Sequence, residues 1–144
     1  MTSRELILDK IKRNKPQEQV ALSENIFFSP NVDDNFLKFT DTLISISGSV
    51  VEATNYAAIE KNLTETFNDA KIIISTVEEI NIGNTRLENI SDPHDLSLVD
   101  LTVLRGAIGV AENGAIWLDE TNIGAHRVLP FITQHLVIIL DKKT

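Results

Sequence analysis

The amino-acid sequence predicts an α/β protein with a Rossmann-like, mostly parallel sheet flanked by helices. Apolar side chains recur at helical spacing in residues 33–47 and 55–67, and a short run of β-branched residues follows each of these segments. Helices that alternate with strands in this order indicate parallel strands joined by right-handed crossovers. The length of 144 residues suits a single core of moderate size.

The N-terminal segment is predicted to form a short amphipathic helix that ends before Pro16. Thr2 and Glu5 have the spacing of a capping box, and Asp9 and Arg13 stand one helical turn apart, where opposite charges form an ion pair. We expect the basic side chains of this helix to form a solvated face, with a docking patch as the alternative. These side chains are Lys10, Lys12, Arg13 and Lys15.

Polar residues and prolines dominate the segment after this helix, and an apolar patch at Ile26–Phe28 interrupts them. We therefore predict a connecting arm whose aromatic side chains cover part of the core. In this interpretation residues 1–30 form the N-terminal helix and arm, and residues 31–144 form the α/β domain.

The domain is predicted to begin with a helix over residues 33–47, with Gly48 at the C′ position. A short strand at Val50–Val51 follows, and Asn55 caps the next helix. Lys71–Ser75 contains three consecutive isoleucines, which favours a strand that is buried on both faces.

Two further apolar runs, Ala115–Leu118 and Leu136–Leu140, are predicted to be buried strands, with Trp117 in the core. The first run follows several small residues and the tripeptide Glu112–Gly114, a pattern that predicts a tight backbone passage feeding a buried strand. The sequence ends directly after the last strand, which an α/β sheet usually covers with a helix. We therefore expect either a compact fold or a missing C-terminal piece.

The composition excludes several classes of function. The chain has no cysteine, so it carries no disulfide, no thiolate nucleophile and no cysteine-ligated iron–sulfur cluster. The formal net charge of −8 disfavours nucleic acid as a partner, because phosphate backbones are bound by clustered Lys and Arg. Neither a secretory signal nor an apolar run of membrane-spanning length is visible, so we expect a soluble cytoplasmic protein.

The segment Asp100–Leu118 resembles the central signature of the LUD domain family, the family of lactate utilization protein C. That signature has an aspartate that opens a hydrophobic, glycine-rich passage, then Ala-Glu-Thr-Gly, then an apolar strand. A leucine- and proline-rich turn and a strand opened by histidine follow, as Arg127–Phe131 and His135–Ile139 do here. The family usually has Thr-Gly at Leu104–Arg105 and Thr at Asn113.

The resemblance implies a fold of the NagB/RpiA/CoA-transferase group and a cytoplasmic role in the oxidation of L-lactate to pyruvate. With the absence of cysteine, it implies an accessory, non-catalytic chain without a cofactor, beside two partner proteins that hold the iron–sulfur clusters. A small anion is the expected ligand, and a homo-oligomer is compatible with this role. The residues assigned to the ligand site are Asp100, Gly109, Glu112, Asn113, Gly114, His126 and Arg127.

Glu112 is the main candidate for a residue with a chemical role, and three roles are open for it. It accepts backbone hydrogen bonds at a tight turn, it contacts a ligand, or it acts as a nucleophile, which requires a positioned and partly desolvated carboxylate. The tripeptide Glu112–Gly114 also resembles the Ser-Glu-Asn-Gly motif of coenzyme A transferases. An acyl-CoA or sugar-phosphate transferase or hydrolase that uses Glu112 is therefore the alternative function, and a scaffold without a ligand is a third.

Four other polar residues have simpler expectations. Asp100 is expected to orient the passage that follows it by accepting backbone hydrogen bonds. Arg127 suits recognition of a carboxylate or phosphate through its forked guanidinium, with an ordinary surface arginine as the alternative. His135 is expected to be a structural hydrogen-bonding residue at a strand start, and His94 to be solvated. The three histidines lack the spacing of metal ligands, so we predict no metal site.

Overall fold

The computed structural model describes residues 2–15, 32–124 and 126–142. The predicted arm around Ile26–Phe28 lies outside the described residues. The chain divides into two units, Met1–Pro30 and Asn31–Thr144, and each is described by itself. In these described ranges, no helix has both the length and the apolar character needed to cross a membrane.

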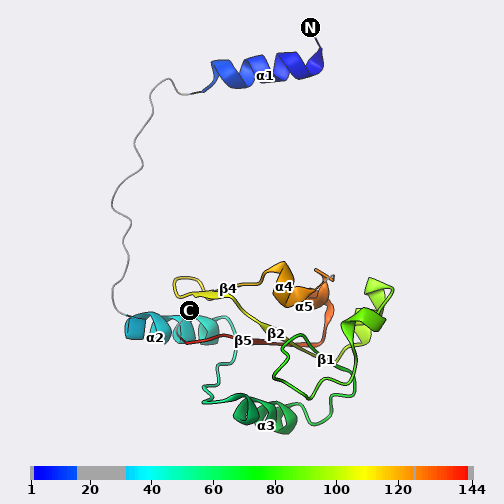
Figure 1. Cartoon of the computed structure of the whole chain (residues 1–144). Coiled ribbons are helices and arrows are strands. Elements are labelled where there is room, and N and C mark those ends of the chain that lie inside the picture. Colours follow the sequence, from blue (N-terminus) through cyan, green and yellow to red (C-terminus); the bar gives the residue numbers. More distant parts are fainter. Residues whose placement is uncertain (1, 16–31, 125, 143–144) are drawn as a thin grey trace. The chain divides into compact units, whose positions relative to one another are not determined.

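The first unit carries helix α1 (Ser3–Arg13), which begins as predicted (Figure 1). The Thr2 backbone N–H donates to Glu5 Oε2 at 2.7 Å, and the Glu5 backbone N–H donates to Thr2 Oγ1 at 3.3 Å. The capping box is therefore confirmed. The expected ion pair between Asp9 and Arg13 is also present, at 2.7 Å.

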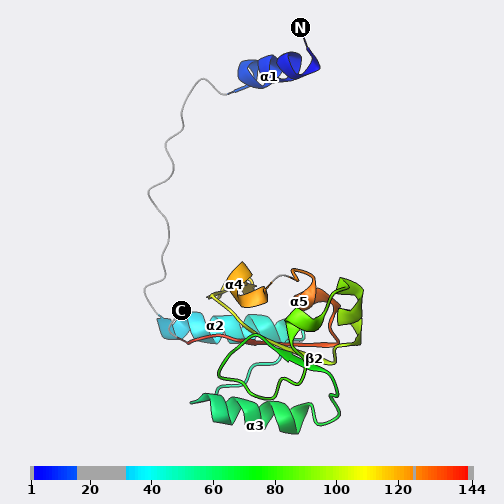
Figure 2. The same ribbon diagram turned by 45° about the vertical axis from the view of Figure 1, so that its right-hand side comes forward.

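The second unit contains a three-stranded parallel sheet, a two-stranded hairpin and helices that flank the sheet (Figures 1 and 2). The α/β class is thus confirmed. Its elements in chain order are α2 (Val32–Ser45), α3 (Tyr56–Thr66), β1 (Ile73–Ser75), the 3-10 helices η1 (Leu87–Asn89) and η2 (Pro93–Leu98), β2 (Leu101–Arg105), β3 (Ile108–Val110), β4 (Ala115–Trp117), α4 (Glu120–Ile123), α5 (Leu129–Ile132) and β5 (His135–Ile139).

The parallel sheet has the strand order β1–β2–β5, with β2 in the centre. Leu101 pairs with Ile73 on one side and with His135 on the other, so the three strands start at the same end of the sheet. The connections between them contain η1 and η2 in one case and α4 and α5 in the other. Such long connections are what parallel pairing requires.

Helices cover both faces of this sheet, with α3 on one side and η2, α4 and α5 on the other (Figure 2). Because side chains alternate along a strand, β2 contributes to both layers. Leu101 and Val103 pack in the cluster that contains Leu63 of α3, whereas Leu104 packs in the cluster that contains Leu129 of α5. The core therefore lies above and below β2.

Helix α3 forms as the sequence predicts, since Asn55 caps it and its apolar residues share one face. Asn55 Oδ1 accepts the Ala58 backbone N–H at 2.9 Å, which confirms the cap. Leu63 is buried, and Tyr56 and Ile59 pack against the same cluster. This packing fixes the first residue of α3 beside the sheet.

The prediction misses the central strand. We expect a glycine-rich passage between Asp100 and Gly114, but residues 101–105 form β2, and its first four residues are buried. Thr102 and Arg105 interrupt the apolar run and glycines follow, so the local pattern is weak. Burial between two helical layers decides the conformation here.

The hairpin of β3 and β4 replaces the predicted buried strand at Ala115–Leu118. Ile108 pairs with Trp117 in an antiparallel register, and the outer positions of both strands are exposed. Trp117 is 66% exposed, so its assignment to the core is wrong. The prediction fails because an apolar run does not reveal which face finds a partner layer.

The inner face of the hairpin packs closely on its neighbours. A Cβ atom at Gly109 would lie 2.7 Å from Leu140 Cδ2 and 3.2 Å from Phe39 Cε2, so only glycine permits this approach. The Thr42 hydroxyl of α2 donates to the Lys38 carbonyl at 2.7 Å and lies 3.3 Å from the Ala111 carbonyl. Helix α2 and the end of β5 therefore support the hairpin from one side.

Two details near the end of α2 differ from the prediction. Ser47, and not Gly48, adopts the left-handed conformation, with φ 69°, and Gly48 donates its N–H to the Leu43 carbonyl at 2.8 Å. The glycine therefore stands one residue later in the helix-ending motif. Val50–Val51 forms no strand, because no neighbouring strand in the described residues pairs with it.

Candidate functional site

The carboxyl end of the parallel sheet brings together polar side chains from three segments. Arg105 is the last residue of β2, Tyr56 is the first residue of α3, and Glu79 lies in the turn after β1. Arg105 Nη2 donates to Tyr56 Oη and to Glu79 Oε2, each at 2.8 Å. The Arg105 guanidinium carbon also lies 5.6 Å from the centre of the Tyr56 ring. We call these three residues the Arg105 cluster.

Local structure explains why these residues meet. The turn after β1 is closed by a hydrogen bond from the Ile80 N–H to the Val77 carbonyl at 3.1 Å, and both side chains are buried. Glu79 between them is therefore held at the rim of the sheet. Tyr56 is anchored by the packing of α3, and Arg105 by its place at the end of a buried strand.

The charges of the cluster stabilise one another. The hydrogen bond with Tyr56, supported by Glu79, raises the pKa of Arg105 above its ordinary value. The backbone N–H of Glu79 and the Arg105 guanidinium hold the pKa of the Glu79 carboxyl below its usual value. The two side chains stay 39% and 46% exposed. The cluster is thus a charged pair that remains open to water.

Arg105 retains hydrogen-bond donors that the cluster does not use. Its hydrogen bonds to Tyr56 and Glu79 both leave from Nη2, and within the described residues the Nε and Nη1 donors have no partner. Guanidinium N–H groups are the donors that recognise carboxylates and phosphates in proteins. Arg105 can therefore donate hydrogen bonds to an anionic ligand without losing all of its bonds to the protein.

A second cation lies at the same end of the sheet. Lys142 follows the last strand, and its Nζ pairs with Glu52 at 3.2 Å and lies 4.0 Å from the centre of the Phe36 ring. The contact with the ring places the ammonium over an aromatic face, a favourable arrangement for a cation. The carboxyl end of the sheet thus holds two ordered cations, each with one acidic partner.

Asp100 lies at the opposite end of β2 and makes only main-chain contacts. Its Oδ2 accepts the backbone N–H of Ile72 at 2.8 Å and that of Lys71 at 2.7 Å, and these bonds lower the pKa of Asp100. Its carbonyl accepts the His135 backbone N–H at 2.9 Å. Asp100 therefore joins the starts of all three strands. Asp100 orients the residues that lead into β1 rather than the passage that follows Asp100 itself. The parallel register places these residues beside the start of β2.

Glu112 is exposed in the loop of the hairpin and makes no hydrogen bond or ion pair with other described residues. Asn113 Oδ1 accepts the Ala115 backbone N–H at 3.0 Å instead, and Gly114 has φ 70° and donates to the Val110 carbonyl at 2.9 Å. The expectation that Glu112 accepts backbone bonds at this turn is therefore wrong. The shorter side chain of Asn113 reaches the nearby N–H with less loss of freedom.

The remaining predicted site residues lie elsewhere. His126 and Arg127 lie between α4 and α5, and Arg127 pairs with the exposed Glu120. His135 opens β5 as expected, and its ring centre lies 5.1 Å from that of Phe67. The seven residues assigned to the ligand site therefore fall into three groups: the amino end of β2, the hairpin and the α4–α5 turn.

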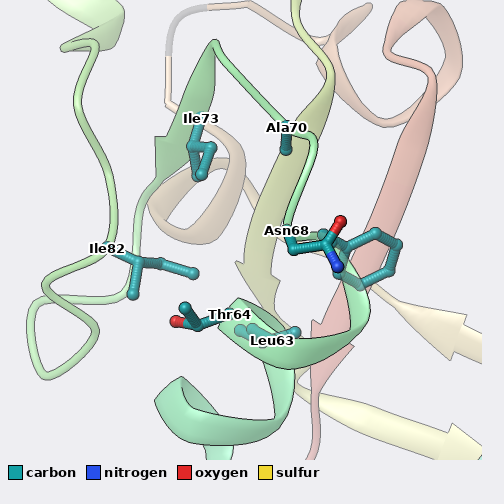
Figure 3. A pocket seen from close by; sticks show the side chains of 7 residues that line it. Leu63, Thr64, Asn68, Ala70, Ile73 and Ile82 are labelled. Atoms are coloured by element: carbon teal, nitrogen blue, oxygen red, sulfur yellow. The ribbon is translucent and has the colours of Figure 1, made fainter.

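A shallow hollow of about 300 Å³ lies between the last turn of α3 and β1. In Figure 3 the side chains of Ile73 and Ile82 point into it, beside the turn that carries Leu63 and Thr64. No charged side chain lines the hollow, so it offers an anion no cationic partner. Its lining residues are Leu63, Thr64, Phe67, Asn68, Ala70, Ile73 and Ile82.

Sequence reasoning missed the Arg105 cluster because its members are far apart in the chain. Forty-nine residues separate Tyr56 from Arg105. One signal was available: Arg105 is a charged residue that ends an otherwise apolar run, which marks the point where a buried strand reaches the surface. Its partners depend on the packing of α3 and on the turn after β1.

Two further observations concern the chain as a whole. Among the described residues, no group of three or more histidine, aspartate or glutamate side chains is arranged to hold a metal ion. Comparison of the sequence and fold with protein-family models, curated proteins and solved structures finds no match.

Proposed function

We propose that this chain is a cytoplasmic accessory component of L-lactate oxidation, and that it binds a small monocarboxylate at the Arg105 cluster. The observation that carries the proposal is the Arg105 guanidinium, held at the carboxyl end of the central strand with unused donors. Ligands of open α/β sheets bind outside this end of the strands. The resemblance of Asp100–Leu118 to the LUD signature supports the lactate system, and the parallel sheet flanked by helices suits a NagB/RpiA/CoA-transferase-like fold.

The charges around Arg105 favour a ligand with one negative charge. Glu79 lies 2.8 Å from Arg105 and offsets its charge, so a second negative charge on the ligand would be repelled by the Glu79 carboxylate. L-lactate and pyruvate each carry a single carboxylate. The Tyr56 hydroxyl lies beside the guanidinium, where it can contact the 2-hydroxyl oxygen of L-lactate or the 2-oxo oxygen of pyruvate. The LUD family usually has Gly at position 105, so we assign this ligand contact to a feature of the present chain.

The absence of cysteine supports an accessory role. A chain without cysteine offers no thiolate to hold an iron–sulfur cluster, so we assign the redox centres to partner proteins. The part played by this chain is then to bind substrate or product and to contact those partners. Acyl-CoA chemistry at Glu112 is the competing proposal, and the exposed carboxylate there lacks the desolvation that a nucleophile of this kind requires.

Deletion of the gene in the organism of origin tests the proposal. We expect the deletion strain to grow normally on glucose but poorly on L-lactate, and the wild-type gene to restore growth. Arg105→Met should fail to restore it, whereas Arg127→Met, a matched loss of an exposed and paired arginine, should succeed. Growth on L-lactate that is unaffected by the deletion would refute the lactate role.

The competing proposal has a test of its own. The purified chain is incubated with an acyl-CoA, treated with borohydride and analysed by peptide mass spectrometry. We expect no mass shift on the peptide that contains Glu112. A shift there that Glu112→Gln abolishes would establish a covalent intermediate and overturn the non-catalytic role.

A further inference from the structure

The hairpin has an outer surface that is apolar although it faces solvent. We define the hairpin face as Ile108, Val110, Ala115 and Trp117, which share one side of the β3–β4 ladder in two cross-strand pairs. Trp117 is 66% exposed, Ile108 is 54% exposed and Val110 is 40% exposed. A two-stranded ribbon supported on its other face normally presents polar side chains to water.

The hairpin face is also rigidly presented. Its inner side is fixed against Phe39 and Leu140 through Gly109, and Gly114 in its loop lies beside Thr42 and Leu43 of α2. Cross-strand pairing aligns the outer side chains in adjacent rows. An apolar surface held in place in this way loses little conformational entropy when a partner covers it.

The hairpin face belongs to a unit of acidic composition. Glu112 stands in the hairpin loop, and α2, which supports the inner side of the hairpin, carries the exposed Asp41 and Lys38. Both carboxylates are exposed, and neither makes a hydrogen bond or ion pair within the described ranges. Residues 31–144 carry 17 acidic and 8 basic side chains in all. A matching partner surface must therefore be apolar at its centre and basic around it.

The hairpin face of a second copy matches the hairpin face poorly. Two copies paired through this face would bring two acidic surfaces together, which is repulsive. The exposed apolar area of the three larger residues is roughly 300 Å², well below the ~800 Å² per partner of a stable protein interface. A heterologous partner can supply the remaining contacts through basic residues that meet the acidic surroundings.

We propose that the hairpin face docks a partner protein whose contact surface is an apolar patch rimmed by lysine or arginine. The inference does not depend on the ligand proposed for Arg105, because it rests on different residues. Ile108 and Trp117 supply the apolar anchors, and Glu112 supplies charge at the rim. Aromatic anchors surrounded by charged rims are the usual arrangement of such surfaces.

Fluorescence of Trp117, the single tryptophan of the chain, reports on the hairpin face without a label. The full-length chain is titrated with an alternating leucine–lysine heptapeptide and, separately, with the matching leucine–glutamate heptapeptide. We expect the lysine peptide to shift the Trp117 emission to shorter wavelength and the glutamate peptide to have no effect. Salt at 0.5 M should weaken the interaction about threefold or more.

Variants that keep Trp117 assign the binding to the hairpin face. Ile108→Ser should weaken the lysine peptide about fivefold or more, and Glu112→Gln should reduce the salt dependence. Phe131→Ser, which removes another highly exposed aromatic ring outside the hairpin, should leave binding unchanged. Circular dichroism and urea unfolding show whether each variant is folded before its affinity is compared.

Three results would overturn the proposal. Equal binding of both peptides would remove the charge selectivity. An emission shift that grows with protein concentration alone would identify a second copy as the occupant. Failure of acrylamide to quench Trp117 in the monomeric chain would show that the chain itself already covers the hairpin face.

Discussion

The two ends of β2 are held by different kinds of contact. At the amino end Asp100 accepts two backbone N–H groups and gives its carbonyl to a third, so every partner is main chain. At the carboxyl end Arg105 bonds to the side chains of Tyr56 and Glu79, both of which reach solvent. Main-chain partners cannot move away without opening the sheet, whereas side-chain partners can rotate. The amino end is therefore built for stability, and the carboxyl end can exchange contacts with a ligand.

The comparison of the two ends first requires that their buried side chains contribute equally to the free energy of unfolding. Leu101 near the amino end and Leu104 near the carboxyl end are both fully buried. We expect Leu101→Ala and Leu104→Ala each to lower the free energy of unfolding by about 2–5 kcal/mol, because each removes buried methyl groups and leaves a cavity. Urea unfolding followed by circular dichroism measures both. A loss below 1 kcal/mol at one end only would show that this end is loosely packed.

Replacement of Asp100 sharpens the comparison through pH. Its folded-state pKa lies below the ordinary value of 3.8, so the ionised carboxylate stabilises the fold above that pH, and the contribution is lost as the pH falls through the lower folded-state value. We expect Asp100→Asn to be less stable than the wild type at pH 7, and the difference to shrink as the pH drops below 3.8. Unfolding free energies measured at a series of pH values test this, with Asp41→Asn as control, since Asp41 is exposed and its carboxylate has no hydrogen bond or ion pair within the described residues. A pH-independent difference would contradict the role of the charge.

At the carboxyl end we expect function to change more than stability. Arg105→Met should lower the free energy of unfolding by about 1 kcal/mol or less, since partly exposed ion pairs contribute little. It should, however, abolish binding of pyruvate and L-lactate in calorimetry. Arg127→Met serves as the matched control and should bind normally. Retained binding in Arg105→Met would remove the ligand from this end of the sheet, and the lactate role would then rest on the resemblance alone.

The smallest effect is expected for Tyr56→Phe, which removes one acceptor from the Arg105 cluster and keeps the ring. Stability should fall by about 1 kcal/mol or less. Affinity for pyruvate should fall about fivefold, because the guanidinium loses one of the two contacts that orient it. Calorimetry on Tyr56→Phe and on Arg105→Met ranks the two residues by their contribution to the affinity for pyruvate. An equal loss in both variants would show that Tyr56 contributes as much as the arginine itself.

Much of the helical structure could be predicted, because its signals are local. The Thr2–Glu5 capping box, the Asn55 cap and the apolar face around Leu63 each depend on residues within a few positions of one another. The β-branched run before Ser75 likewise predicted a strand. Parallel pairing was predicted correctly from an alternation of helices and strands, although one strand of that alternation, Val50–Val51, does not form.

The strands around the candidate site could not be predicted in the same way. An apolar run shows that burial of a segment is favourable, but it does not show how many layers of the fold will cover that segment. The run at 101–105 lies between two layers and is the most buried strand, whereas β4 in the run at 115–118 has exposed positions on one face and only partial burial on the other. Trp117 is therefore exposed and Thr102 is buried, the reverse of what their polarity suggests.

The sequence by itself determined the three longer helices, α1, α2 and α3, the α/β class and the absence of cysteine chemistry in this chain. Only the tertiary structure decided that Arg105 meets Tyr56 and Glu79, and that Glu112 stands in an exposed loop without a partner in the described residues. The physical reason is the separation along the chain of the residues that interact. Caps and helical faces are set by neighbours in the chain, whereas a site at the end of a sheet is assembled from segments that meet only when the layers pack.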